Sequence, residues 1–100
     1  MSKNKEKFYY LLLSFGAGAD MWDVEDEIKD VLGRYSDGSG CGFGRRDLSY
    51  YYKNLNSLKA AVRKVRSLPR RIKCEAWDYT SIDGEDYNFG GPKISLRGVR

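Results

Sequence analysis

The stretch FYYLLLSF at residues 8–15 decides the fold of this chain. Aromatic and aliphatic side chains occupy both sets of alternating positions, a pattern typical of a central β-strand that is covered on at least one face. The segment Gly16-Ala17-Gly18 follows and breaks the strand. The rest of the chain is therefore expected to assemble around this strand.

A first amphipathic helix is predicted for residues 21–34. Asp20 is the expected N-terminal cap, and acidic residues crowd the first half of the helix, where the helix dipole favours negative charge. The apolar stripe that should face the core consists of Val24, Ile28, Val31, Leu32 and Tyr35.

A second amphipathic helix precedes Pro69, which ends it. We expect Asn56 to cap its N-terminus, with Leu55 packing just before the cap. Its apolar stripe consists of Leu58, Ala61, Val62, Val65 and Leu68.

Three further strands are expected. Residues 72–79 alternate Ile72, Cys74 and Ala76 with polar or larger residues, as a half-buried strand does. Residues 48–53 form a β-prone run, and residues 41–46 read as a short strand after a loop at residues 37–40. The segment 41–53 fits either a hairpin or one long bent strand with glycine bulges.

The element order strand, helix, strand, strand, helix, strand predicts an α+β, ferredoxin-like βαββαβ sandwich. Right-handed crossovers place both helices on one face of an antiparallel sheet, with the strands in the spatial order fourth, first, third, second. We expect a polar N-terminal tail at residues 1–7, the domain at residues 8–79, and a Gly-rich C-terminal extension or extra hairpin at residues 80–100.

Two resemblances accompany this fold. The order of elements over residues 8–79 is similar to that of the RNA recognition motif, with Gly42-Phe43-Gly44 resembling the centre of that family's third-strand motif and residues 8–11 lying where its first-strand motif would be. The chain departs from the motif after Gly44, where Arg45-Arg46-Asp47 replaces the expected aromatic and aliphatic residues. The segment GSGCGFGRRD at residues 38–47 also resembles small uncharacterised microbial ferredoxin-like proteins, a resemblance that implies no activity.

Charge is distributed unevenly along the chain, whose formal net charge is +4. Residues 48–73 carry eight basic side chains and no acid, whereas residues 21–36 carry five acids and two bases. A basic region of this kind fits phosphate or an acidic protein surface. The expected contact residues are Arg45, Arg46, Lys59, Arg63, Arg66, Arg70, Arg71 and Lys73. Two alternatives remain, namely a solvated outer face and pairing with the acidic first helix.

The sheet face away from the helices forms a second candidate surface. If Leu11 faces the core, Tyr10 lies on the open face, where Tyr51 and Trp77 are expected to join it. Aromatic rings on an open sheet can stack with nucleic-acid bases. The alternative is that the C-terminal extension or a second subunit covers this face, the latter giving a homodimer.

The chain lacks the residues that several kinds of functional site require. The chain has no histidine and two cysteines, which are too few ligands for a zinc site. Cys41 and Cys74 fall on opposite edges of the expected sheet, so we predict two buried free thiols rather than a disulfide. The glycines near residue 40 run from a helix into a strand, the reverse of a phosphate loop.

These observations predict a cytoplasmic protein without a membrane span, metal or cofactor, and without enzymatic activity. The predicted function is a binding module for nucleic acid that uses the basic second helix. The alternative is a small inhibitor or immunity-type factor that blocks a partner protein through its charged surface. The sequence does not decide between them, because size and charge segregation fit both.

Overall fold

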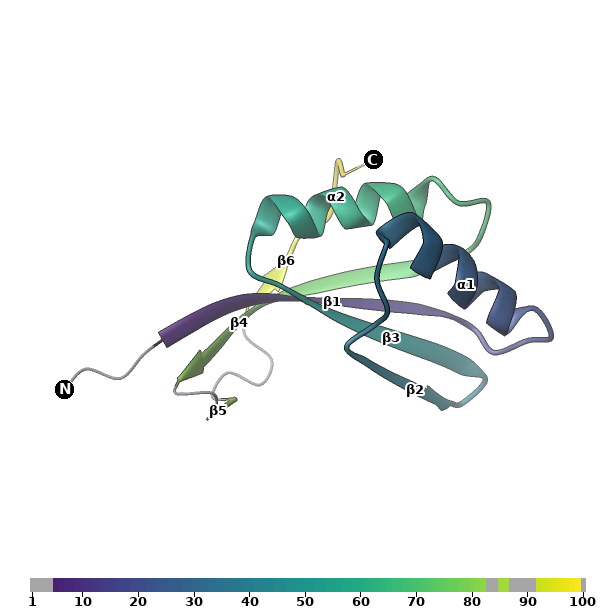
Figure 1. The fold of residues 1–100 in the computed structure, drawn as a ribbon, viewed down its shortest axis with the longest axis horizontal. Helices are drawn as coiled ribbons and strands as arrows, with labels where there is room; N and C mark the ends of the chain where they lie inside the picture. The colour runs from purple at the N-terminus through teal and green to yellow at the C-terminus, as the bar shows by residue number, and fades with distance from the viewer. Residues whose placement is uncertain (1–4, 83–84, 87–91, 100) are drawn as a thin grey trace.

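The computed structural model describes residues 5–82, 85–86 and 92–99. Two α-helices and six β-strands follow one another along the chain (Figure 1). In order they are β1 (Lys5–Gly16), α1 (Met21–Leu32), β2 (Gly38–Gly42), β3 (Arg45–Tyr52), α2 (Leu55–Arg66), β4 (Lys73–Ile82), β5 (Glu85–Asp86) and β6 (Lys93–Ile94).

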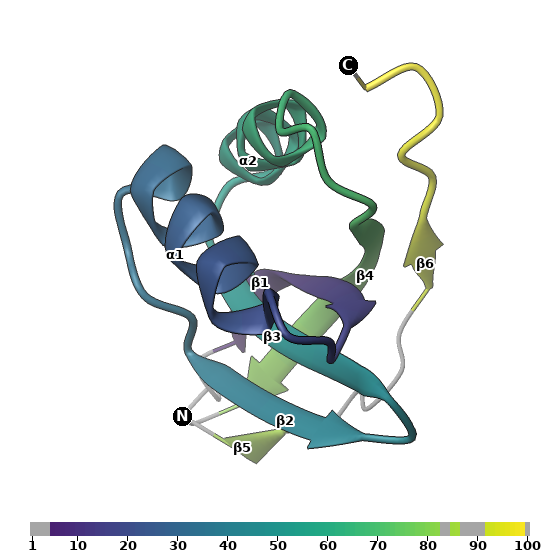
Figure 2. The ribbon, with the colours of Figure 1, turned by 90° about the vertical axis from the view of Figure 1, so that its right-hand side faces the viewer.

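One antiparallel sheet contains all six strands, in the order β2-β3-β1-β4-β5, with β6 also paired to β4. Both helices lie on the same face of the sheet (Figure 2). The predicted α+β class is therefore confirmed, and β4, β1, β3 and β2 are neighbours in the expected sequence. The sheet differs from a simple four-stranded one because the short strands β5 and β6 extend it beyond β4.

The core lies between the sheet and the two helices. Leu11, Leu13 and Phe15 of β1 are at most 2% exposed, so this alternating set is the one that faces the helices. Against them α1 buries the first part of its expected apolar stripe and α2 buries all of its stripe except Leu68, and β3 and β4 complete the core. The buried residues from these elements are Val24, Ile28, Leu48, Tyr50, Leu58, Ala61, Val62, Val65 and Ala76.

Two strands are longer than expected. β1 begins at Lys5, within the predicted polar tail, because Lys5 to Lys7 pair with residues 80–82 of β4. β4 accordingly continues past residue 79 into the predicted extension. Polar residues can extend a strand when a neighbouring strand supplies backbone hydrogen bonds, which sequence periodicity does not reveal. Residues 1–4, 83–84, 87–91 and 100 lie outside the described residues.

Residues 38–52 form a hairpin, which settles the choice between a hairpin and a bent strand. The prediction of a loop at residues 37–40 was wrong, because β2 begins at Gly38. The prediction of one strand over residues 41–46 was also wrong, because β2 ends at Gly42, before Phe43. The turn lies at Phe43-Gly44, with φ of 52° and 74°. Positive φ at both central positions is the geometry of a type I′ turn, the connection that suits two twisted antiparallel strands.

Two helix caps and one apolar position also differ from expectation. Asn54, rather than Asn56, caps α2, and its side chain accepts hydrogen bonds from the backbone N–H groups of Asn56 and Ser57. Asp20 precedes α1 without a side-chain capping bond, because its carboxylate pairs with Arg70. Tyr35 is 76% exposed, since α1 ends at Leu32 and the helical spacing does not continue to it.

The C-terminal segment returns to the body of the protein. After β6 the chain crosses toward α2 (Figure 2), and Leu96 and Val99 are buried at 7% and 6% exposure. Arg66 of α2 donates hydrogen bonds from Nη1 to the carbonyl oxygens of both residues. This segment is therefore an integral part of the hydrophobic core.

Candidate functional site

Three aromatic residues form a continuous row on the sheet face opposite the helices. Tyr10 of β1 lies opposite Tyr51 of β3 and Trp77 of β4 in the strand register. The Tyr10 ring centroid lies 5.2 Å from that of Tyr51 and 5.6 Å from that of Trp77. Phe8 extends the cluster, with its ring 6.5 Å from Tyr51. The structure thus brings together the three residues that the sequence placed on this face.

Lysines flank the row beside Trp77. Lys93 of β6 lies opposite Trp77 in the register, and its Nζ lies 5.8 Å from the Trp77 ring centroid. The same Nζ is 2.7 Å from the carboxylate of Glu75, and the Nζ of Lys73 is 3.5 Å from it. The hydrogen bond from Lys93 lowers the pKa of Glu75, although desolvation opposes this effect. Glu75 is therefore a carboxylate compensated by two cations.

Four of the predicted basic residues, here called the basic stripe, run from α2 into the connection after it: Lys59, Arg63, Arg66 and Arg70. Contacts within the protein divide this basic stripe. Arg70 pairs with Glu27 of α1 at 2.5 Å and with Asp20 at 3.0 Å. Its hydrogen bond to Glu27 raises the pKa of Arg70 and lowers that of Glu27. Arg66 is bound to the two C-terminal carbonyls. Pairing with the acidic first helix, one of the two alternatives to a contact surface, is thus found for Arg70.

The two arginines that follow the hairpin turn face opposite sides of the sheet. Arg45 donates a hydrogen bond from Nε to Ser14 Oγ at 2.9 Å. Arg46 points toward α1, where its guanidinium bonds to Glu25 at 2.7 Å and lies 5.0 Å from the Trp22 ring centroid. Arg46 is therefore held in an ion pair, whereas Arg45 remains exposed beside the open face.

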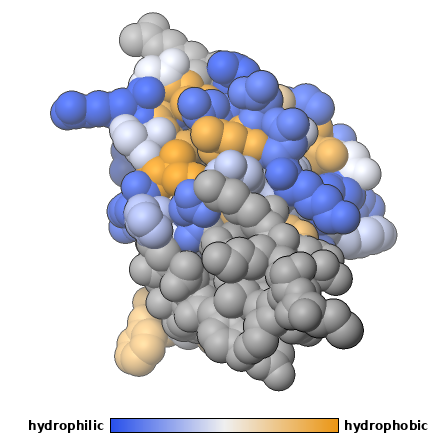
Figure 3. Space-filling model, turned by 90° about the vertical axis from the view of Figure 1, so that its left-hand side faces the viewer, coloured by the Kyte–Doolittle hydropathy of each residue, from blue (hydrophilic) through white to orange (hydrophobic). Residues whose placement is uncertain are grey.

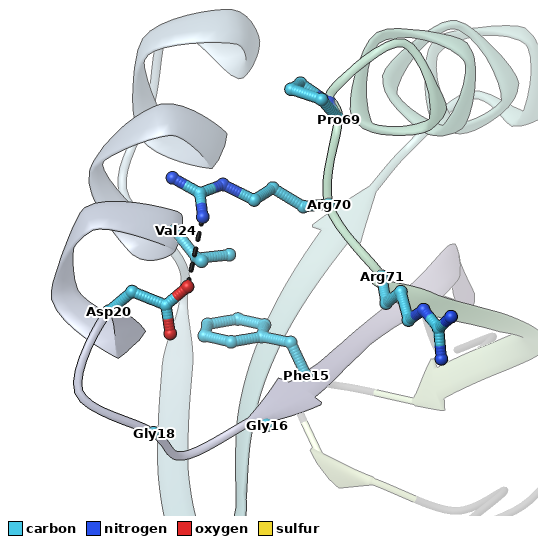
Figure 4. A pocket seen from close by; sticks show the side chains of 8 residues that line it. All are labelled: Phe15, Gly16, Gly18, Asp20, Val24, Pro69, Arg70 and Arg71. Atoms are coloured by element: carbon cyan, nitrogen blue, oxygen red, sulfur yellow. Dashed lines mark hydrogen bonds and ion pairs between the residues drawn. The ribbon is translucent and has the colours of Figure 1, made fainter.

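The remaining predicted cations lie away from the aromatic row. Lys59, Arg63 and Arg71 form no ion pair with any other residue that the structure describes. Arg71 and Arg70 line a pocket of about 360 Å³ between the β1–α1 and α2–β4 connections, floored by Phe15. Figure 4 shows Arg70 reaching toward Asp20 while Arg71 points away from it. The pocket therefore does not gather the two guanidinium groups on one ligand.

The cysteines are free and far apart in the sheet, one on β2 and one on β4. Cys41 is exposed, so the prediction of a buried thiol was wrong for this residue. It lies on the outermost strand, β2, and its Sγ is 3.7 Å from Met21 Sδ. Cys74 is half-buried, and burial raises the pKa of its thiol. A raised pKa makes a thiolate less available.

Sequence reasoning missed three features of the surface. Lys93 was not singled out, because the Gly-rich extension has no periodicity that places it beside Trp77. Trp22 and Phe43 are 58% exposed and fully exposed, respectively, although both are large and apolar. The exposure of Trp22 could have been predicted, because this residue falls outside the apolar stripe of α1. The position of Phe43 in a turn could also have been predicted, because it lies between two glycines.

No group of three or more acidic or cysteine side chains within residues 5–82, 85–86 and 92–99 is arranged to hold a metal ion. Across the same residues, neither helix is long and apolar enough to span a membrane. Seen from the left of Figure 1, the part of the surface formed by described residues is mainly hydrophilic around a small group of hydrophobic residues (Figure 3). Comparisons with protein-family models, curated proteins and solved structures found no match to this chain.

Proposed function

We propose that this chain is a ferredoxin-like binding domain without catalytic activity, and that it binds single-stranded nucleic acid across the open face of its sheet. The observation that carries the proposal is the row of Tyr51, Tyr10 and Trp77 on three adjacent strands. Base stacking on aromatic rings contributes about 1–3 kcal/mol per base and tolerates any sequence. A sheet with such rings is a platform on which successive bases can stack.

Charge supports the same surface. Lys73 and Lys93 together outweigh Glu75 by one positive charge beside Trp77. Arg45 and Asp47, which is also on β3, offset each other farther along the face. Positive charge therefore exceeds negative charge by one among these described side chains, which favours contact with backbone phosphates. In contrast, Arg66 at the end of α2 and Arg70 in the connection after it are occupied by internal partners, which disfavours this helix as the principal contact.

Fluorescence anisotropy with labelled single-stranded RNA, single-stranded DNA and duplex oligonucleotides tests the proposal. We expect micromolar binding to single strands at about 50 mM salt that weakens as salt rises. Trp77→Leu should reduce the affinity about tenfold, consistent with the loss of one stacked base. The control Trp22→Phe, on the helix side, should leave the affinity unchanged.

A matched pair of charge variants separates the sheet from α2. Lys93→Gln and Lys59→Gln each remove one positive charge, but from opposite sides of the molecule. The proposal expects the larger loss of affinity from Lys93→Gln. It fails if no oligonucleotide binds at about 50 mM salt, where phosphate contacts are strong. It also fails if Lys59→Gln weakens binding while Trp77→Leu and Lys93→Gln do not.

A further inference from the structure

The outer edge of β2 plays no part in the proposed function. Among the described residues β2 pairs with β3 alone, whereas on the other side of the sheet β4 is followed by β5 and β6. An unpaired edge presents backbone N–H and C=O groups that another strand can use, and lysine or proline commonly protects such edges. The sequence of β2, Gly38-Ser39-Gly40-Cys41-Gly42, contains neither.

Two glycines in this edge are not required by the packing of the chain. A Cβ atom added at Gly40 or Gly42 would meet nothing within 4 Å, and neither residue has a positive φ. Glycine weakens a strand and often marks a place where another backbone approaches closely. At Gly38, in contrast, a Cβ atom would lie 2.8 Å from Ser49 Oγ, so contacts within the chain account for that glycine.

The hairpin turn determines which backbone groups face outward. A two-residue turn closes on a hydrogen-bonded pair, here Gly42 and Arg45, and hydrogen-bonded pairs alternate along an antiparallel ladder. Gly40 and Gly38 therefore bond to β3 as well. The N–H and C=O groups of Ser39 and Cys41 consequently point to the outer edge, where they are available to a further strand.

Exposed aromatic residues lie at both ends of this edge, on the helix side. Trp22 lies near the Cys41 end, since it contacts Arg46, the residue opposite Cys41. Tyr35 lies three residues before β2 at the other end, with Lys29 Nζ 4.8 Å from its ring centroid. Trp22 and Tyr35 are 58% and 76% exposed. The edge thus combines free backbone groups with uncovered apolar surface.

Charge favours an uncharged occupant that is itself a β-strand. β2 contains no charged residue, and two arginines near it are matched, because Arg46 pairs with Glu25 and Arg34 with Asp37. Nothing in this edge attracts a polyanion. A second β2 strand meets both conditions, since pairing β2 with β2 sets no like charges opposite each other.

We propose that two copies of this chain associate through their β2 edges, antiparallel about a two-fold axis at Gly40. In this register Ser39 of each copy is hydrogen-bonded opposite Cys41 of the other, so all the outward backbone groups of both residues are used. The same axis brings Trp22 of one copy beside Tyr35 and Lys29 of the other. Because the strands are short, we expect a dissociation constant of about 10–100 µM.

Sedimentation equilibrium without nucleic acid, from about 5 to about 500 µM protein, tests the association. Ser39→Pro removes one outward N–H and leaves the hydrogen bonds to β3 intact, so it should weaken the dimer at least tenfold. Ser39→Ala keeps that N–H and should behave as the unmodified chain does. A chain that is monomeric throughout this range, or a dimer that both variants retain equally, overturns the proposal.

A crosslink tests the register, and it decides the matter if Ser39→Pro fails to fold by circular dichroism. In a Cys74→Ser background, Ser39→Cys places a new thiol opposite Cys41 of the second copy, at an alpha-carbon separation of about 5.5 Å that a disulfide can span. Mild oxidation should give a covalent dimer, whereas Cys74→Ser alone should not, because Cys41 then faces Ser39. Equal crosslinking of the two proteins, or none of either, contradicts the register.

Discussion

The guanidinium of Arg70 lies 2.5 Å from the carboxylate of Glu27, measured from Nη2 to Oε2, and a second bond of 3.1 Å joins Nε to Oε1. This two-pronged contact joins the α2–β4 connection to α1. Arg70 was expected either to contact an external anion or to pair with the acidic first helix, and in the structure it links two elements of the fold. The contribution of this ion pair to the stability of the protein can be measured by unfolding at acidic pH.

Glu27→Gln should remove part of the acid sensitivity of the protein. The hydrogen bond from Arg70 lowers the pKa of Glu27 below its ordinary 4.5, so its contribution is present above pH 4.5 and lost as pH falls through the lowered pKa. We expect the variant to have a lower urea midpoint than the unmodified protein at pH 7, and the difference to shrink as pH falls below 4.5 and through the lowered pKa. Asp30→Asn, on the exposed face of α1, is the control; an equal effect there would point to general charge rather than to this pair.

Asn54→Ala should destabilise the protein by about 1 kcal/mol, because α2 loses the side chain that accepts from two backbone N–H groups. Asn56→Ala should change the free energy of unfolding by less than about 0.5 kcal/mol, since its side chain is exposed. Urea unfolding of both variants distinguishes the cap found in the structure from the one predicted from sequence. Equal losses would contradict the assignment.

Phe43→Asn should stabilise the protein by about 0.5–1 kcal/mol, because asparagine tolerates a left-handed backbone better than phenylalanine does. The Phe43 ring is fully exposed, so its removal takes no packing from the described structure. Gly44→Ala, at φ 74°, provides the opposite control and should destabilise the same turn by about 1 kcal/mol. A loss of stability in Phe43→Asn would show that the ring contributes to the fold.

Leu96→Ala should cost about 2–3 kcal/mol, as expected for a buried leucine. Ser95→Ala, at the exposed neighbouring position, should be neutral within about 0.5 kcal/mol. Thermal or urea unfolding of the pair tests whether the C-terminal segment belongs to the cooperative core. Two neutral substitutions would place this segment outside it.

Tyr50→Phe should make the protein more resistant to alkali. Burial raises the pKa of Tyr50 from 10.0 to about 12, so its contribution is fully present below pH 10 and is lost as pH rises through 12. Two pH units correspond to about 2–3 kcal/mol of unfolding free energy, which the variant should retain. Urea midpoints between about pH 9 and pH 12 measure the effect. Trp22→Phe, an exposed aromatic position without a titratable group, should not change the alkaline profile.

Local patterns were sufficient for the elements whose faces differ strongly in polarity. Val24 and Ile28 on α1, like Leu58 and Val62 on α2, recur at helical spacing and are buried. In β1, by contrast, both alternating sets are apolar, so the sequence predicted the strand but left open which set faces the helices. These elements carry their own signal because burial on one side selects apolar residues at a fixed period.

Other features depend on contacts between distant residues, which periodicity does not encode. β2 is built of glycine, serine and cysteine, and pairing with β3 makes it a strand despite a composition typical of loops. Lys93 joins the aromatic row because β6 pairs with β4. The division of the basic stripe follows from Asp20 and Glu27 lying beside Arg70, a proximity that charge counts along the chain only suggest.

The two edges of the sheet determine how far association can continue. The β4 side is already occupied by short strands of the same chain, and the β2 side is not. A head-to-tail contact between two different edges could be repeated without limit, whereas a contact of one edge with its own copy cannot. Pairing of β2 with β2 about a two-fold axis uses the same edge of both copies, so it closes the assembly as a finite pair and does not lead to the open-ended stacking of fibres.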